Sequence, residues 1–291
     1  RVPFLWALAF VVILVFVGLR HHVGMDWNNY LVMIHRANIG SWWQSFITAE
    51  PGYATLLWIA GQNGWGVYGA YFMGTVFFAA GLFRYAKTTP APWIALLVAM
   101  PFLVIVVAMS AARQAVAIGV LLWLAAEWPR ASARKRVLLI LLAASFHMSA
   151  IGFLAFAFLD LRLPVWAKVM GSMIMAILMI YILQASGHAD YYNDLYATGQ
   201  TELTQSTGAI FHVMLNGGPA LMCFLLGPRA REILLPDALH KQMAILAIML
   251  IPMAFVMSAA SGISPPERLL GNEIKRALAG LRLDAAAPGP S

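Results

Sequence analysis

The feature that most constrains this sequence is a series of apolar runs, several of them long enough to cross a membrane, that alternate with short polar segments. The hydrocarbon core of a bilayer is about 30 Å thick, which a helix of roughly 20 apolar residues spans. Of the 291 residues, 62% are hydrophobic and 11% are charged, and the mean hydropathy is +0.77, well outside the range of soluble domains. We therefore predict an all-α polytopic membrane protein with roughly 8–9 transmembrane helices, some of them short or broken half-helices.

The apolar pattern covers most of the chain. We predict a single transmembrane helical domain over 1–261 and a polar tail over 262–291, where proline and charge replace the apolar runs. Pro101 is expected to kink the span that contains it. The predicted spans are about Val2 to Leu19, Val67 to Phe83, Pro92 to Ala108, the run from Ala108 to about Trp128, Val137 to Leu159, Val165 to Leu183, Ala209 to Leu226 and Met243 to Ala260.

Lysine and arginine set the predicted topology, because short cytoplasmic loops of membrane proteins are enriched in them. The loops over about 129–136 and 227–241 are basic and are expected on the cytoplasmic side. The loops over about 20–52 and 185–208 are expected outside, and the second contains acidic residues but no lysine or arginine. Glu50-Pro51-Gly52-Tyr53 is expected to end the first outer loop and to begin a helix too short to span, because a proline pushes the preceding residue out of the helical region.

The segment Val137 to Leu159 is interrupted by Phe146-His147-Met148-Ser149-Ala150. Its length suits a single crossing, which would place His147 roughly 15 Å along the helix from Val137, close to the middle of the membrane. Arg162 and Lys168 instead suggest that the chain has returned to the cytoplasmic side. We favour the second interpretation, a bent hairpin of two half-helices.

Arg113 and Gln114 enter the first turns of an apolar helix on the predicted outer side, with Ser110 as the expected N-cap. A guanidinium at the boundary of the hydrocarbon is costly and is by default a functional candidate. A helix N-terminus adds backbone N–H groups and a positive dipole end, which together suit a phosphate or diphosphate. The alternative is an interfacial arginine whose side chain extends to lipid headgroups.

Other polar residues near this predicted face have two interpretations each. His147, with Ser149, is a candidate general base, because a desolvated imidazole tends to be neutral, or it is a packing residue hydrogen-bonded to a neighbouring helix. Asp26 and Glu50 either activate a hydroxyl or hold a sugar, or are ordinary solvated carboxylates. The tyrosines of Asp190–Tyr196 either stack on sugar rings or form an interfacial aromatic belt.

Several classes of chemistry find no support in the sequence. Cys223 is the only cysteine, which leaves neither a disulfide framework nor a cysteine metal site. There is no P-loop, no dinucleotide-binding glycine motif and no His-Glu-x-x-His, so no metal and no cofactor are predicted. The net charge of +7 is attributed to topology and headgroup attraction rather than to nucleic-acid binding, since no basic patch lies on a soluble domain.

The order and separation of four motifs resemble those of the EpsG family of Wzy-like bacterial exopolysaccharide polymerases. The likeness covers roughly residues 1–185 and is carried by Gly24-Met25-Asp26-Trp27-Asn28-Asn29-Tyr30, Glu50-Pro51-Gly52-Tyr53, Arg113-Gln114 and Phe146-His147-Met148-Ser149-Ala150. The resemblance implies a multi-pass glycosyltransferase of the bacterial inner membrane. It would join undecaprenyl-diphosphate-linked oligosaccharide repeat units on the outer face, together with a flippase and chain-length regulator proteins of the same pathway.

The resemblance also implies a set of site residues. Family members continue with an arginine-containing motif after a serine-bearing helix, for which Ser258 and Arg268 are the candidate counterparts. The expected catalytic residues are Asp26, Glu50, Arg113 and His147. The expected substrate-binding residues are Tyr30, Tyr53, Gln114, Ser149 and Arg268.

In the mechanism that we infer from these residues, Arg113, aided by Gln114, stabilises the diphosphate leaving group. The base that deprotonates the acceptor hydroxyl is a loop carboxylate or His147, with the carboxylates ranked first because they lie nearer the aqueous face. A flippase that binds the lipid diphosphate, a membrane O-acyltransferase that uses His147 and a non-catalytic scaffold are the competing functions.

Overall fold

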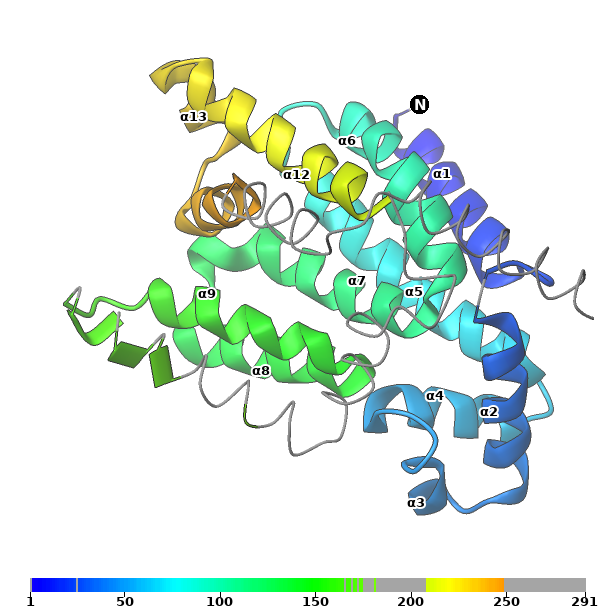
Figure 1. Cartoon of the computed structure of the whole chain (residues 1–291). Coiled ribbons are helices and arrows are strands. Elements are labelled where there is room, and N and C mark those ends of the chain that lie inside the picture. The colour runs from blue at the N-terminus through cyan, green and yellow to red at the C-terminus, as the bar shows by residue number, and fades with distance from the viewer. Residues whose placement is uncertain are drawn as a thin grey trace, which may run out of the picture. The chain divides into compact units, whose positions relative to one another are not determined.

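The computed structural model describes residues 2–24, 26–164, 166–168, 170–171, 173–174, 181 and 208–248. All regular elements in these residues are helices, as the sequence predicts (Figure 1). The chain divides into two compact units, Arg1–Met173 and Ile174–Ser291. The candidate site lies entirely in the first unit.

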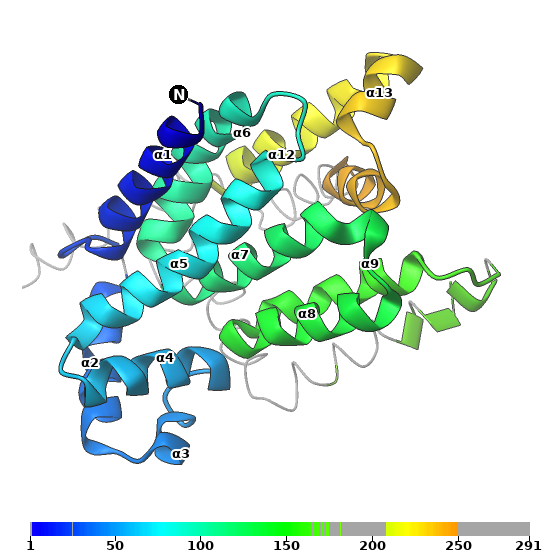
Figure 2. The same cartoon turned by 180° about the vertical axis from the view of Figure 1, so that it is seen from behind.

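Helix α5 (Gly66–Ala86) is the central helix of the first unit. It packs against α1 (Val2–Gly18), which lies at the edge of the unit, and against α7 (Ala112–Glu127) (Figures 1 and 2). Within the described residues, α5 is the one helix that is by itself long and apolar enough to cross a membrane, and several shorter apolar helices accompany it. The predicted number of transmembrane helices therefore stays a prediction.

Glycine residues allow α7 to pack closely against α5. A Cβ atom on Gly81 would overlap the backbone carbonyl of Gly119, and one on Gly74 would lie 2.9 Å from the Val116 side chain. Glycine at such crossings allows the backbones of two helices to approach closely, which increases their van der Waals contact. This close crossing fixes the axis of α7 and therefore the position of its first turn.

The junction before α7 differs from the prediction. Helix α6 (Pro92–Ala99) continues as the π-helix η1 (Met100–Ala108), in which Pro101 is the second residue. Helical backbone then runs on through Ser110, and the chain leaves it only at Ala111, with φ −107° and ψ 78°. The prediction that Ser110 caps α7 is therefore wrong, because Ser110 still lies inside the preceding helical turn.

The segment after α7 is a hairpin. Helix α8 (Ala133–Phe146) ends at His147, which has the extended angles φ −156° and ψ 119°, and the chain continues through the 3-10 helix η3 (Met148–Gly152) into α9 (Phe153–Leu159). Arg136, in the first turn of α8, forms an ion pair with Asp160, directly after α9. The chain therefore returns to the end at which α8 began, which agrees with the favoured hairpin and not with a single crossing.

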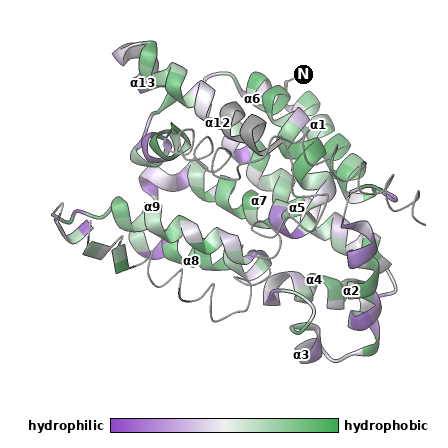
Figure 3. Ribbon diagram, viewed as in Figure 1, coloured by the Kyte–Doolittle hydropathy of each residue, from purple (hydrophilic) through white to green (hydrophobic). Residues whose placement is uncertain are grey.

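Three short helices cover the end of the first unit that contains the hairpin tip. They are α2 (Trp27–Ile39), α3 (Trp42–Ser45) and α4 (Pro51–Gln62). Figure 3 shows hydrophilic residues in α2 and α3 and a largely hydrophobic α1. Helix α4 begins at Pro51 and has 12 residues, too few to span a bilayer, as predicted.

In the second unit the structure describes residues 174, 181 and 208–248. Helix α12 (Gly208–Leu225) contains Pro219 and occupies the predicted span from Ala209, and α13 (Pro228–Leu234) lies in the predicted basic loop. A further apolar helix covers Ala238–Ile248. Several predicted features lie outside the described residues. They are Asp190–Tyr196 and nearly all of the loop 185–208, most of the predicted spans Val165 to Leu183 and Met243 to Ala260, Ser258, Arg268 and the tail 262–291.

The close packing of α4 against α8 explains why the third residue of the Glu50-Pro51-Gly52-Tyr53 motif is a glycine. A Cβ atom at this position would lie 2.5 Å from the hydroxyl oxygen and 2.8 Å from the backbone carbonyl oxygen of Ser145, near the end of α8. The first turn of α4 and the last turn of α8 therefore meet at a distance that only glycine allows. This contact brings the N-terminus of α4 to the hairpin tip.

We predict that Gly52→Ala forces α4 and α8 apart and destabilises the fold by about 1–3 kcal/mol, the usual cost of overpacking. Gly152→Ala is the matched control, because a Cβ atom there meets nothing within 4 Å and the backbone is right-handed helical (φ −56°). Thermal unfolding of both variants in detergent measures the difference. Equal melting temperatures for the two variants would contradict the close α4–α8 contact.

Candidate functional site

Glu50 lies where three separate segments of the chain meet. It is the N-cap residue of α4, held out of the helix by Pro51. Its Oε2 accepts a hydrogen bond of 2.8 Å from Nη1 of Arg113, in the first turn of α7. Its Oε1 is 3.2 Å from Nδ1 of His147 and accepts a hydrogen bond of 3.3 Å from the backbone N–H of Met148, at the hairpin tip. Both oxygens of one carboxylate are therefore used, one for each neighbouring segment.

The environment of Glu50 favours its charged form. Burial raises the pKa of the carboxyl group, but the hydrogen bonds from His147 and from backbone N–H groups, with the Arg113 charge, outweigh burial and lower this pKa to about 2. Glu50 is therefore ionised at physiological pH. A carboxylate with so low a pKa is a weak base, although it holds its hydrogen-bond donors firmly.

The contact with Glu50 determines which nitrogen of His147 carries a proton. An ionised carboxylate has no proton to donate, so Nδ1 of His147 must be the donor. In the neutral imidazole the other nitrogen, Nε2, is then an acceptor. No hydrogen bond reaches Nε2 from the described residues, and 23% of the side chain is exposed. His147 can therefore accept a proton from a ligand at this position.

Tyr30 provides the cap that Ser110 does not. Its hydroxyl oxygen accepts a hydrogen bond of 3.2 Å from the backbone N–H of Arg113, one of the N–H groups that a helix start leaves without a partner. The ring of Tyr30 is buried between Tyr53 and Tyr71, with centroid distances of 5.7 and 5.3 Å. Helix α2 is thereby tied to the first turn of α7.

Arg113 keeps donors for a ligand. The guanidinium has five N–H groups, and Glu50 accepts one of them in the geometry described. The side chain is 30% exposed. Planar donors at a helix N-terminus match the oxygens of a phosphate or diphosphate. The site thus combines an anion-binding cation with a neighbouring proton acceptor.

Asp26 lies at the same end of the first unit but outside this contact. Asp26 directly precedes α2, and its charge interacts with Tyr30, as does the charge of Arg113. Asp26 forms no ion pair with another described residue. A Cβ atom on Gly24, which has φ +99°, would lie 2.9 Å from Cα of Ser110. The loop before Asp26 therefore packs against the residues that precede α7.

The other predicted site residues are distributed around this contact. Gln114 and Ser149 are exposed, and in the described part of the chain neither side chain makes a hydrogen bond. Tyr53 is fully buried beneath Tyr30. Arg268 lies outside the described residues. The residues in direct contact are Tyr30, Glu50, Arg113 and His147.

Sequence reasoning missed Arg20, the second residue after the end of α1. Only 5% of this residue is exposed, its Nη1 donates a hydrogen bond of 2.8 Å to the backbone carbonyl of Ala108, and its guanidinium carbon lies 3.8 Å from the centre of the Tyr71 ring. Arg20 thus ties the end of α1 to the chain just before α7. An arginine that closes an apolar run was the available indication, but such residues usually extend to the lipid headgroups.

No group of three or more histidine, cysteine, aspartate or glutamate side chains comes together to hold a metal ion within the described residues. The carboxylate at the centre of the site is occupied by Arg113 and His147. The groups that this contact presents to a ligand are a guanidinium, an imidazole and the carboxylate between them.

The low pKa of Glu50 predicts a pH-dependent stability. A carboxyl group whose pKa is lower in the folded than in the unfolded state stabilises the fold above its unfolded pKa, and this effect is lost as the pH falls through the folded pKa. The melting temperature of the native protein should exceed that of Glu50→Gln by a constant amount above pH 4.5, its ordinary pKa, and by less and less as the pH falls towards about 2.

The control for this measurement is Glu232→Gln, which changes an exposed carboxyl group on α13 that forms no ion pair within the described residues. Its melting temperature should follow that of the native protein at every pH. If the melting temperatures of the native protein and of Glu50→Gln differed by the same amount above pH 4.5 and near pH 2, the result would contradict the charged contact.

No curated protein and no solved structure matches this chain. The family model for the EpsG family matches residues 4–265, which extends beyond residue 185, includes Ser258 and ends before Arg268. The match also includes every residue of the contact described above, and it confirms the resemblance carried by the four motifs. The chain belongs to the EpsG family.

Proposed function

We propose that this protein is a multi-pass glycosyltransferase of the bacterial inner membrane that polymerises undecaprenyl-diphosphate-linked oligosaccharide repeat units into exopolysaccharide on the outer face. Membership of the EpsG family is consistent with a Wzy-like polymerase. The observation that carries the proposal is the contact of Glu50 with both Arg113 and His147. It puts donors for a diphosphate beside an acceptor for a proton, and glycosyl transfer from a lipid diphosphate requires both.

Arg113 acts on the leaving group. The bond between the anomeric carbon and the diphosphate oxygen breaks, and negative charge develops on the diphosphate. The guanidinium N–H groups of Arg113 that Glu50 does not accept stabilise this charge at the N-terminus of α7, a contribution on the order of 3 kcal/mol for one donor. The Glu50 contact holds the guanidinium in place before the substrate arrives.

His147 acts on the acceptor. Its Nε2 takes the proton from a sugar hydroxyl as the hydroxyl oxygen forms a bond to the anomeric carbon, and Glu50 stabilises the resulting imidazolium through Nδ1. This assignment changes the order predicted from sequence, in which the carboxylates came first. The low pKa of Glu50 suits it to orient its two neighbours, while Asp26, which forms no described ion pair, is the alternative base.

The competing functions use only part of this contact. A flippase would bind the diphosphate through Arg113 but would not need a histidine with an acceptor nitrogen beside it. An O-acyltransferase would use His147 but would leave Arg113 without a role. The glycosyltransferase accounts for both residues and for the carboxylate between them.

We predict that Arg113→Ala lowers polymerisation by roughly 100-fold or more, the effect of losing one charge-stabilising donor, and that Arg113→Lys recovers part of the activity. The measurement is the size distribution of cell-surface polysaccharide in a strain without the native gene, with protein levels checked by immunoblot. Arg36→Ala is the matched control, because Arg36 is an exposed residue of α2. Normal polymer length in both Arg113 variants would contradict the assignment.

An assay on the purified protein separates a polymerase from a flippase. Purified protein given lipid-linked repeat units in detergent should lengthen the glycan, although no second compartment is present. Binding of the lipid without any lengthening would support the flippase instead.

A further inference from the structure

A cavity of about 520 Å³ lies between α1, α5 and α7, away from the candidate site. Arg84, at the cavity, forms an ion pair with Glu127, the last residue of α7, whereas Arg113 is in the first turn of the same helix. Glu127 comes 14 positions after Arg113, which corresponds to roughly 21 Å along the helix axis. The cavity is therefore at the opposite end of α7 from the Glu50 contact.

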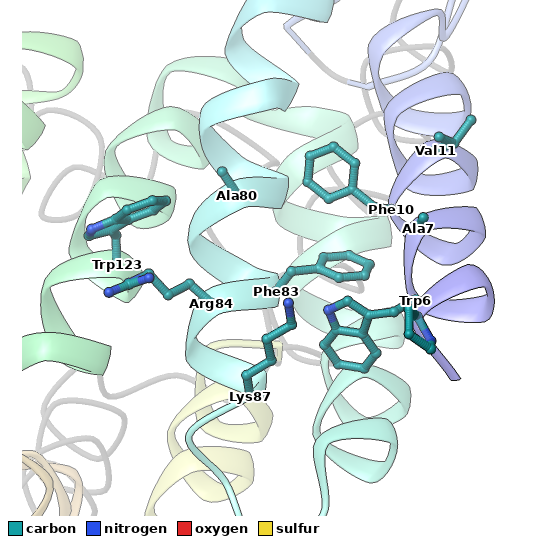
Figure 4. Close-up of a pocket in the computed structure, with 10 residues that line it drawn as sticks. Trp6, Ala7, Phe10, Val11, Ala80, Phe83, Arg84, Lys87 and Trp123 are labelled. Atoms are coloured by element: carbon teal, nitrogen blue, oxygen red, sulfur yellow. The ribbon is translucent and has the colours of Figure 1, made fainter. Parts of the chain in front are cut away.

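One part of the cavity is apolar. Phe10 and Val11 of α1 and Ala80 of α5 line it, and the rings of Phe10 and Phe83 lie edge to face at 5.2 Å (Figure 4). Val11 is 51% exposed although it is a large apolar residue. This part of the wall offers hydrocarbon contact and no hydrogen bond.

The other part of the cavity is cationic. Ala80 and Arg84 lie on one face of α5, and Lys87, the C-cap residue of α5, continues this face, so that the three residues cover roughly 10 Å along the helix axis. Figure 4 shows Arg84 beside Trp123 and Lys87 beside Trp6, below the apolar wall. The guanidinium lies 4.6 Å from the Trp123 ring centre, and the ammonium lies 5.5 Å from that of Trp6.

The positive charge at this end is not neutralised by the described residues. Arg84 shares the carboxylate of Glu127 with Lys135. Lys87 forms no ion pair with another described residue. Three cations therefore lie near one carboxylate, and a ligand with a negatively charged headgroup would neutralise part of the excess positive charge.

We propose that this cavity binds an anionic glycerophospholipid, with an acyl chain along Phe10, Val11 and Ala80 and with the phosphate at Arg84 and Lys87. Lys135, which shares Glu127 with Arg84, belongs to the loop over 129–136 that is predicted to be cytoplasmic. Basic pockets between membrane helices on the cytoplasmic side bind anionic headgroups, and tryptophans are typical of the membrane interface. Inorganic phosphate would leave the apolar wall without a partner. A zwitterionic lipid has no net charge and would not neutralise the excess of positive charge.

The test uses the purified full-length protein, delipidated in detergent, with phosphatidylglycerol, phosphatidylcholine and inorganic phosphate as probes and native mass spectrometry as the readout. Phosphatidylglycerol should bind the native protein more tightly than phosphatidylcholine. Lys87→Gln should weaken phosphatidylglycerol binding about fivefold, the usual effect of one cation near an anionic membrane surface. Arg134→Gln is the matched control, because Arg134 is an exposed cation at the same end of the unit and outside the cavity.

A second variant tests the apolar wall separately. Ala80→Trp fills the cavity and leaves both cations, so it should also weaken phosphatidylglycerol binding. Equal binding of the two lipids, an equal loss in Arg134→Gln, or full competition by inorganic phosphate would overturn the proposal. So would a dimer that Ala80→Trp abolishes while lipid binding is unchanged, because the cavity would then hold a second copy of the chain.

Discussion

The carboxylate of Glu50 is the interaction on which the arrangement of the first unit depends. It joins the start of α4, the start of α7 and the tip of the α8–α9 hairpin, three segments that are far apart in the sequence. Removing one member of a partly buried charged contact leaves the other charge without a partner, which is strongly unfavourable. The helix ends are therefore held together by charge, although most of the surface that they bury is apolar.

Neighbouring residues make this contact sterically attainable. The crossing of α5 and α7 at Gly81 and Gly119 sets the axis of α7, and the absence of a side chain at Gly52 lets α4 reach the hairpin tip. Tyr30 caps α7 from α2, and Arg20 ties α1 to the residue at which η1 ends. Each residue of Glu50-Pro51-Gly52-Tyr53 thus has a separate role: the charge, the helix start, the close approach and the buried ring beneath Tyr30.

Among the described residues, the sequence predicted the apolar helices, their breaks and the hairpin, but not the π-helix η1, the start of α7 or all of the contacts between the elements. Apolar runs, prolines and basic loops predict the helices, the breaks and the hairpin, because these depend on local composition and on charge. The choice of Glu50 rather than Asp26 as the partner of Arg113 depends on how α2 and α4 pack, which no local pattern contains. Ser110 stays in the helical backbone that continues from the π-helix η1, which the composition does not predict. The burial of Arg20 depends on contacts with Ala108 and Tyr71, which are far away in the sequence.

The central claim is that Glu50 and His147 act as one unit. The most direct measurement is a double-mutant cycle in which the polymerisation rate of the purified protein is compared for Glu50→Gln, His147→Gln and the double variant. If Glu50 acts through His147, the double variant should lose much less activity than the product of the two single losses. A loss equal to that product would mean that the two residues act independently, and it would contradict the account.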